Sequence, residues 1–206
     1  MVDFGAGRGQ FIEDCVSYRR DLRWLKGRVQ RIIGLDVDDI VLENTSLDES
    51  HVIFEGGPLP LAEGSVDLII SDYTFEHVKD PRWVAEELSR ILKVGGWICA
   101  RTPNKWGYIA VLARFVPNKL HNAVLRVFQP QKKRVDTFPT LYRLNTRRDL
   151  RRFFSVRRFE HIILEHDAEP AYAANSILGW RLSLFLHRIS PRRIRSMLFI
   201  FLQKKH

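Results

Sequence analysis

Cysteine is scarce in this sequence, which has only Cys15 and Cys99 among its 206 residues. Two cysteines so far apart supply neither a disulfide framework nor the paired spacing that holds a zinc ion. We therefore expect no metal site, and we expect both cysteines to be small buried hydrophobic residues in a reducing compartment. The chain is long enough to bury a sizeable core, and a single domain over residues 1–206 is expected.

Long apolar runs are also missing. The most apolar stretches, residues 177–189 and 196–203, are broken by charge or are shorter than the ~20 residues that a bilayer span needs. The N-terminus lacks the basic-then-apolar pattern of an export signal. These absences predict a cytoplasmic protein, and they leave open peripheral contact with the inner face of the membrane.

Acidic residues are few in the second half of the chain. Residues 1–100 hold 18 Asp and Glu against 11 Lys and Arg, whereas residues 101–206 hold 6 against 22. The net charge of +9 therefore combines an acidic half with a strongly basic half, and the two are expected to face different things. An anionic acceptor, a membrane surface or RNA would suit the basic half, although a solvated face is the alternative for any single arginine. RNA is disfavoured because no paired aromatic strand motif is present.

Apolar segments alternate with helical patterns along the chain. Strands are expected over residues 1–4, 29–35, 51–54, 66–71, 97–101, 159–165 and 196–203. Helices are expected over residues 10–25, 38–42, 81–92, 107–115, 118–128 and 171–189, with another capped by Asn145 or Thr146. Gly95 and Gly96 are expected to end the helix before the fifth strand. Alternating strands and helices predict an α/β fold with a doubly wound, mostly parallel sheet.

Three glycines open the chain in the stretch MVDFGAGRG, after a short strand and before a helical pattern. Such a turn lets a ligand approach backbone that a Cβ would block. A phosphate loop is excluded because Gln10 and Phe11 follow the last glycine, where Lys and Ser or Thr are required. Gln10 also stands where the dinucleotide fingerprint needs its third glycine. The remaining pattern is D-x-G-x-G-x-G, made by Asp3, Gly5, Gly7 and Gly9.

This pattern resembles motif I of the class I S-adenosylmethionine (SAM) dependent methyltransferases. Three later segments continue the resemblance to the type 11 methyltransferases: IIGLDVD, LPLAEGSVDLIISDYTFEHV and ELSRILKVGGWICARTPN. The resemblance runs along nearly the whole chain and is sharpest over residues 1–104. It implies a Rossmann-like class I methyltransferase fold, with an antiparallel strand near the C-terminus, and SAM as the cofactor.

The resemblance also implies roles for individual residues. Asp3 would receive the ammonium group of SAM, Asp36 would accept hydrogen bonds from both ribose hydroxyls, and Glu55 would lie near the adenine. The alternatives are a turn-closing Asp3, and a solvated Asp36 and Glu55. The residues expected to contact SAM are Asp3, Gly5, Ala6, Gly7, Gly9, Asp36, Val37, Glu55, Gly56, Ser71 and Asp72.

His77, in FEHV just after the fourth strand, is the candidate catalytic base for an oxygen or nitrogen acceptor. The alternative is a histidine that packs against the sheet and bonds to backbone, and Asp72 and Glu76 are lesser candidates for the base. Residues 103–144 are expected to form an inserted lid that binds the acceptor. Its aromatic residues Trp106, Tyr108 and Phe115 would cover the methyl donor or else pad the sheet.

The predicted function is SAM-dependent methyl transfer to a small molecule, a lipid-linked intermediate or a glycan precursor. A non-catalytic binding protein of the same fold and an RNA methyltransferase are the alternatives. The helix over residues 171–189 is expected to cover the sheet, with contact to anionic lipid as the alternative. The family normally has one or two helices before motif I, where this sequence begins. Either the true start lies upstream, or the chain is a fragment, or another segment replaces these helices as the cover of the cofactor. A shortened first strand is expected to lower stability and weaken SAM binding.

Overall fold

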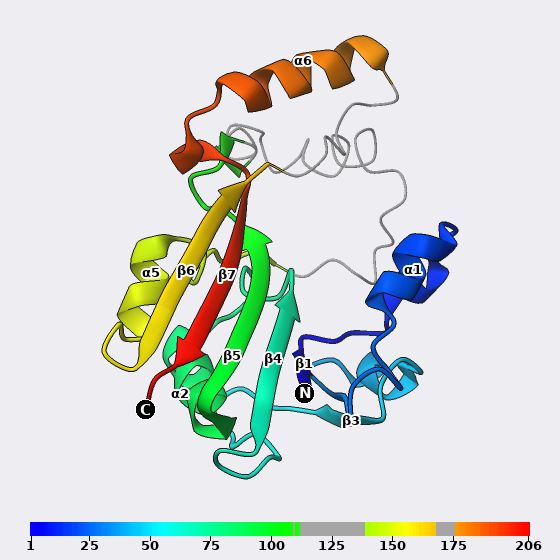
Figure 1. The fold of residues 1–206 in the computed structure, drawn as a ribbon, viewed down its shortest axis with the longest axis vertical. Helices are drawn as coiled ribbons and strands as arrows, with labels where there is room; N and C mark the ends of the chain where they lie inside the picture. The colour runs from blue at the N-terminus through cyan, green and yellow to red at the C-terminus, as the bar shows by residue number, and fades with distance from the viewer. Residues whose placement is uncertain (109, 112–138, 168–175) are drawn as a thin grey trace.

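The structure is a computed structural model that describes residues 1–108, 110–111, 139–167 and 176–206. The described residues form a seven-stranded sheet in the order β3-β2-β1-β4-β5-β7-β6 (Figure 1). The strands are β1 (Val2–Phe4), β2 (Ile33–Asp36), β3 (Glu49–Val52), β4 (Val66–Asp72), β5 (Leu92–Pro103), β6 (Phe159–His166) and β7 (Met197–Lys204). Strands β1 to β5 are parallel, and β7 runs antiparallel to both β5 and β6. The predicted doubly wound sheet with an antiparallel C-terminal strand is confirmed.

The strand order reverses between β1 and β4. From β1 the chain winds outward through β2 to β3, and it then returns to place β4 and β5 on the other side of β1. In such sheets, ligands bind outside the carboxyl ends of the strands at this reversal. We call this side of the sheet the carboxyl edge; Asp36 and Asp72 are the last residues of β2 and β4 and lie there.

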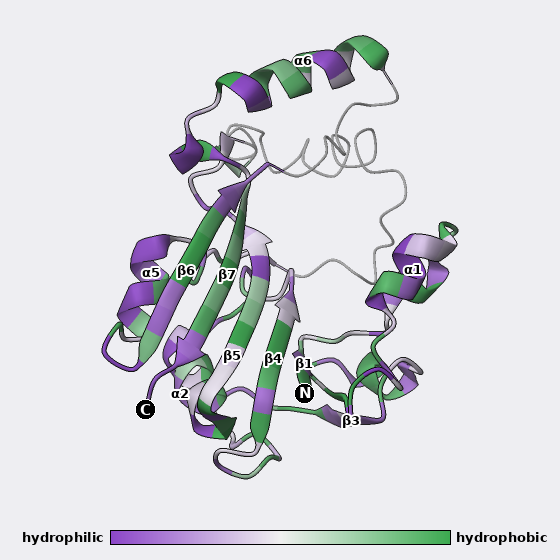
Figure 2. Cartoon of the chain, in the orientation of Figure 1, coloured by the Kyte–Doolittle hydropathy of each residue, from purple (hydrophilic) through white to green (hydrophobic). Residues whose placement is uncertain are grey.

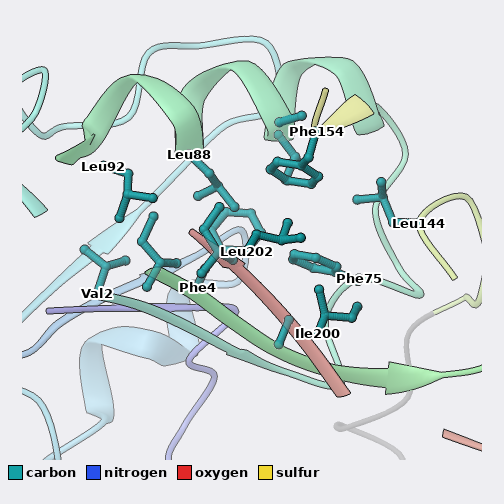
Figure 3. Packing of buried hydrophobic residues seen from close by; sticks show 14 of the residues in the cluster. Val2, Phe4, Phe75, Leu88, Leu92, Leu144, Phe154, Ile200 and Leu202 are labelled. Atoms are coloured by element: carbon teal, nitrogen blue, oxygen red, sulfur yellow. The ribbon is translucent and has the colours of Figure 1, made fainter. Parts of the chain in front are cut away.

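The core lies on one face of the sheet and includes residues of two helices, α2 (Pro81–Ile91) and α5 (Arg147–Phe153). Figure 3 shows these side chains between the strands and α2. Val2 and Phe4 alternate toward the core from the short strand β1, and Leu88 of α2 is fully buried against them. The rings of Phe75 and Phe154 stack with centroids 6.4 Å apart. Burial of such side chains stabilises each by roughly 1.5–3 kcal/mol, so this face fixes the position of β1 in spite of its length.

Helix α2 begins and ends where its sequence predicts. The side chain of Asp80 accepts hydrogen bonds from the backbone N–H groups of Arg82 and Trp83, and Pro81 occupies the first turn. The prediction that Gly95 and Gly96 end this helix is wrong, because α2 ends at Ile91 and β5 begins at Leu92 and runs through both glycines. Leu92 pairs with Val66, and an irregularity in that pairing accommodates the two glycines.

The predicted helix over residues 10–25 is wrong as a single element. The chain forms a 3₁₀ helix, η1 (Gln10–Glu13), and then a separate helix, α1 (Ser17–Arg23). Between them, the side chain of Asp14 accepts a hydrogen bond from the N–H of Val16 and pairs with Arg19, which holds the backbone extended. Cys15 is consequently exposed and Cys99 is half-buried, so the prediction that both are buried is also wrong.

Helix α6 (Ile177–Ile189) lies beyond the ends of the strands and not on a face of the sheet (Figure 1). None of its residues is buried, so the prediction that it covers the sheet is wrong. The start of the predicted helix, residues 171–175, and most of the predicted lid, including residues 112–138, lie outside the described residues. Among the described helices, none has the length and apolar character needed to cross a membrane.

Candidate functional site

The glycine bend, residues 5–9, joins β1 to the chain that follows and is held by the end of β2. The N–H of Gly5 donates to the carbonyl of Leu35 at 2.7 Å, and the N–H of Gly7 donates to Oδ2 of Asp36 at 2.8 Å. The bend therefore lies at the carboxyl edge beside the reversal of strand order, where the sequence predicts the cofactor site.

The glycines of the bend are required for different reasons. A Cβ on Gly5, whose φ is +80°, would lie 2.0 Å from Oγ1 of Thr74, and one on Gly9 would lie 2.6 Å from Oδ1 of Asn44. A Cβ on Gly7, whose φ is +50°, would meet nothing within 4 Å. Gly7 alone therefore presents bare backbone to open space, whereas the other two glycines admit neighbouring side chains.

The side chain of Asn44 is hydrogen-bonded to the bend, and this role was not predicted from the sequence. Its side-chain amide donates to the carbonyl of Gly7 at 3.0 Å, and its Oδ1 accepts the hydroxyl of Ser46 at 2.6 Å. Both residues are buried. No local pattern marks an asparagine after a short 3₁₀ helix, η2 (Asp39–Glu43), as a partner of a bend nearly forty positions earlier, so only the fold reveals it.

Asp36 is oriented by two backbone groups. Its Oδ2 accepts from the N–H of Gly7, and its Oδ1 accepts from the N–H of Asp38 at 3.0 Å. Each carboxylate oxygen has a second lone pair, so both could also accept a hydrogen bond from a ligand. Two neighbouring hydroxyls, such as those of a ribose, match this arrangement. Val37, which follows, is 54% exposed and lies at the same strand end.

Asp3 is the most perturbed acid at the carboxyl edge. Burial of its carboxyl, together with the negative charges of Asp72 and Asp36, raises its pKa to about 7. In the part of the chain that the structure describes, no group donates a hydrogen bond to this carboxylate. A cation bound beside it would relieve the repulsion and lower the pKa. The ammonium or sulfonium of SAM fits this requirement.

Ser71 and Asp72, which the sequence also predicts to contact SAM, make bonds within the protein. The buried hydroxyl of Ser71 donates to the carbonyl of Phe4 at 2.9 Å and so joins β4 to β1. Arg101 donates to both oxygens of Asp72 at 2.6 Å, and its guanidinium lies 4.7 Å from the ring centre of Tyr73. Contact of either residue with SAM stays a prediction.

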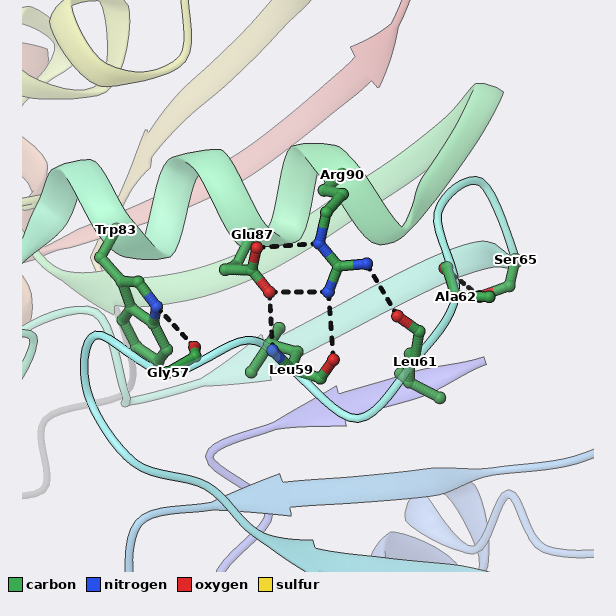
Figure 4. Close-up of polar contacts among 8 residues, drawn as sticks. All are labelled: Gly57, Leu59, Leu61, Ala62, Ser65, Trp83, Glu87 and Arg90. Atoms are coloured by element: carbon green, nitrogen blue, oxygen red, sulfur yellow. Dashed lines mark hydrogen bonds and ion pairs between the residues drawn. The ribbon is translucent and has the colours of Figure 1, made fainter.

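Glu55 and Gly56, predicted to lie near the adenine, follow β3 in a loop. Oε2 of Glu55 lies 3.7 Å from Nζ of Lys79, and Gly56 has a φ of +84°. The continuation of this loop is bound to α2 (Figure 4). Arg90 donates to the carbonyls of Leu59 and Leu61, and it also pairs with Glu87, which accepts the N–H of Leu59. These bonds hold the part of the loop that contains Leu59 and Leu61 against α2.

His77 lies in the turn after β4, and its ring is oriented by backbone. Nδ1 of His77 is 2.9 Å from the carbonyl oxygen of Pro139. Since a carbonyl only accepts, Nδ1 carries the proton, and Nε2 holds the lone pair of the neutral ring. Nε2 lies 3.9 Å from Oε1 of Glu76. The arrangement suits a general base, and it equally matches the alternative of a histidine bonded to backbone.

Glu76 joins three parts of the chain next to His77. It is 3% exposed, and its Oε2 accepts the hydroxyl of Thr102, which in turn accepts the amide of Asn145 at 2.6 Å. The backbone carbonyl of Glu76 also accepts the N–H of Leu141 at 2.7 Å. Burial raises the pKa of this carboxyl. Glu76 thus ties the end of the predicted lid to the turn that carries His77.

A shallow pocket beside β3 is lined by other residues. Its wall includes His51, Phe54 and Pro58, and none of the residues predicted to contact SAM lines it. The predicted site is therefore built from the bend and the strand ends and not from this pocket.

Comparison with known proteins finds a family match in the first half of the chain. Residues 2–100 match the type 11 family, described as a methyltransferase domain. A probable S-adenosylmethionine-dependent methyltransferase from Mycolicibacterium smegmatis is 32% identical over 108 residues. That alignment covers 51% of this chain and 38% of the relative, so this chain spans well under half of the relative's length.

Solved methyltransferase structures have the same fold. A SAM-dependent methyltransferase from Mesorhizobium loti superposes with a TM-score of 0.57 at 16% identity, over 98% of this chain and 89% of that one. Geranyl diphosphate C-methyltransferase from Streptomyces coelicolor superposes with a TM-score of 0.56 at 18% identity, over 98% of this chain and 68% of that one. The latter was crystallised with Mg²⁺, geranyl diphosphate and S-adenosyl-L-homocysteine.

Proposed function

We propose that this chain transfers a methyl group from SAM to an acceptor at the carboxyl edge. The premise is that residues 2–100 match the methyltransferase domain of the type 11 family and that the chain has the class I SAM-dependent methyltransferase fold. The observation that carries the proposal is the Asp3 carboxylate. It is perturbed by burial and by the charges of Asp72 and Asp36, and it belongs to the same motif as Gly7, whose backbone is open. The oxygens of Asp36 are oriented to accept from ribose hydroxyls.

The residues of the edge divide the binding of SAM among themselves. Asp3 would hold the cationic end, Asp36 the ribose hydroxyls, and Gly7 would allow close approach of the ligand to backbone. SAM supplies an activated methyl group on a cationic sulfur. The contribution of the protein is then alignment of the acceptor and exclusion of water, and alignment alone is worth up to about 7–11 kcal/mol in favourable cases.

His77 would accept the proton that an oxygen or nitrogen acceptor loses. The Pro139 carbonyl fixes the proton on Nδ1 and so leaves Nε2 as the basic atom, which supports this role. For an acceptor that loses a proton, replacing His77 with Ala should lower kcat about 10²–10⁴-fold. Kinetics of the wild-type chain and the variant between about pH 6 and 9 would measure this. An unchanged rate throughout would remove His77 from the mechanism.

The acceptor is proposed to be a small molecule, a lipid-linked intermediate or a glycan precursor, and to be anionic. Two observations support an anion. Residues 101–206 carry 22 Lys and Arg against 6 Asp and Glu, and the superposing Streptomyces enzyme was crystallised with an anionic isoprenoid, geranyl diphosphate. A screen of cell extracts with methyl-labelled SAM would identify the class of the acceptor.

Titration calorimetry with SAM tests the proposed function directly. We expect the wild-type chain to bind SAM and Asp36→Asn to bind it at least tenfold more weakly, because an amide offers one acceptor where the carboxylate offers two. Asp39→Asn is the matched control: Asp39 is exposed and lies three positions away. Absence of binding at millimolar SAM, or equal weakening by both substitutions, would overturn the proposal.

A further inference from the structure

Helix α6 has small and polar residues, and not large apolar ones, at its least exposed positions. Its half-buried positions are Gly179, Ser183 and His187, which are spaced four apart and therefore share one face. His187 contacts Tyr108 through Nε2 and the phenol hydroxyl, with ring centroids 5.7 Å apart. Small and polar residues thus face the rest of the protein.

The opposite face of α6 is apolar and exposed. Leu178, Leu182, Phe185 and Ile189 follow the i, i+4, i+7, i+11 spacing of one helical stripe. They are 78%, 57%, 58% and 57% exposed, respectively. Figure 2 shows that hydrophobic residues recur along this helix, which lies apart from the strands. We call these four residues the α6 stripe. Large apolar side chains gathered on one exposed face mark an interaction surface.

Among the described residues, the exposed charges on α6 and in the segment that follows it are those of arginines. Arg181 and Arg188 are exposed beside the α6 stripe, and Arg192 and Arg193 follow in the 3₁₀ helix η4 (Arg192–Ile194). In the described part of the chain, no carboxylate forms an ion pair with these four arginines. The sequence from residue 170 to residue 206 contains neither Asp nor Glu. An apolar stripe flanked only by arginine fits a surface that is apolar below and anionic above, as in a bilayer with acidic headgroups.

We propose that α6 binds the surface of an anionic lipid bilayer, with the α6 stripe in the acyl boundary and the four arginines at the headgroups. A second copy of the chain fits less well, because two such faces would bring the arginines of both copies together. An acidic protein partner would also pair with the arginines, but a surface that binds only such a partner would give no sedimentation with the vesicles used below.

The position of α6 determines which side of the protein would face the bilayer. The chain leaves the sheet at His166 and re-enters it at Met197. His166 pairs with Met197, and Met197 pairs in turn with Pro103 at the end of β5. The segment that carries α6 therefore emerges at the carboxyl edge. If the proposed methyl transfer holds, and only this step rests on it, the site opens toward the bilayer and its acceptor is an amphipathic molecule drawn from it.

Vesicle co-sedimentation without SAM tests the lipid contact. We expect the wild-type chain to sediment with mixed phosphatidylcholine and phosphatidylglycerol vesicles, and to bind phosphatidylcholine alone far more weakly. Leu182→Ser with Phe185→Ser should weaken binding at least about tenfold, since two large apolar side chains are withdrawn from the interface. Ile162→Ser with Leu164→Ser is the matched control, because these β6 residues are 43% and 54% exposed but lie outside the stripe. Circular dichroism would establish that each variant is folded.

Arg181→Glu with Arg188→Glu separates the charge from the apolar contribution. We expect this variant to lose the preference for phosphatidylglycerol and the dependence of binding on salt. Failure of the wild-type chain to sediment would overturn the lipid proposal, as would equal loss in the β6 control. Self-association that disappears in the Leu182→Ser, Phe185→Ser variant, without vesicle binding, would instead assign the stripe to a second copy. Because SAM is absent throughout, none of these outcomes bears on methyl transfer.

Discussion

At the scale of single residues, the glycines of the glycine bend have different structural roles. Gly5 leaves room for Thr74, which belongs to the turn that carries His77, while Gly7 is open. The motif was predicted from the sequence, but this division was not, because the contact between Gly5 and Thr74 joins positions 69 apart. The same holds for Asp3: its place in the motif is local, but its perturbation depends on Asp36 and Asp72.

Substitution of the two glycines by Ala should separate folding from ligand binding. Gly5→Ala drives a Cβ into Thr74 and should lower the free energy of unfolding by roughly 2–4 kcal/mol. Gly7→Ala should cost only about 1 kcal/mol, the strain of a positive φ, yet weaken SAM binding more than tenfold. Thermal denaturation and calorimetry measure both. Equal destabilisation by the two substitutions would contradict the assignment.

Asp3→Asn should stabilise the ligand-free protein in a pH-dependent way. Folding raises the pKa of Asp3 from about 4 to about 7, so in that window the folded state binds the proton more tightly than the unfolded state does. The free energy of unfolding of the wild-type chain therefore falls as pH rises from about 4 to 7, and the neutral Asn escapes this loss.

We expect the variant to match the wild-type chain near pH 4 and to exceed it by roughly 1–3 kcal/mol at pH 8 in urea denaturation. SAM binding should fall in the same variant, so stability and function would change in opposite directions. A difference in stability that does not vary with pH would show that Asp3 is not perturbed as described.

At the scale of elements, the sequence predicted best where one local rule dominates. The helix over residues 81–92, the Thr146 cap of α5 and the seven strands appeared close to where they were expected. It failed where a distant or competing contact decides. Asp14 interrupts the helix over residues 10–25 by bonding the backbone of Val16, and α6 has the composition of a covering helix but not its position.

The clamp between α2 and the loop over residues 57–65 offers a test at this scale. Arg90 contacts two loop carbonyls and the Glu87 carboxylate at once, which a lysine ammonium cannot match. Arg90→Lys should therefore lower the free energy of unfolding by about 1–2 kcal/mol. Arg82→Lys, at an exposed position of the same helix, should change it by less than about 0.5 kcal/mol. Urea denaturation of both variants provides the comparison, and similar losses would argue against the clamp.

At the scale of the whole molecule, the fold brings Asp3, Asp36 and Asp72 together near the ends of β1, β2 and β4. The alternation of strands and helices predicted this edge, since parallel strands bring distant residues together there. The pattern could not reveal how far the acids perturb one another or which of them the protein itself neutralises. Asp72 is paired with Arg101, and Asp3 is not so paired.

Ligand binding should stabilise the whole chain and do so selectively. At a SAM concentration about a hundred times the dissociation constant, mass action adds about 2.7 kcal/mol to the free energy of unfolding. For a chain of this length, the melting temperature should rise by roughly 5–10 °C. Adenosine monophosphate, an anion of similar shape, should produce little change because the acids repel it. A larger shift with the nucleotide than with SAM would reverse the charge assignment.

The direction of the first and last strands along the chain has a practical consequence. β1 begins, and the antiparallel β7 ends, on the side of the sheet opposite the carboxyl edge, where Gln203 pairs with Trp97 and Lys204 with Phe159. A purification tag or fluorescent reporter fused at either terminus should therefore project away from the glycine bend and α6. Immobilisation on a sensor chip through such a tag would leave the carboxyl edge and α6 turned toward the flow.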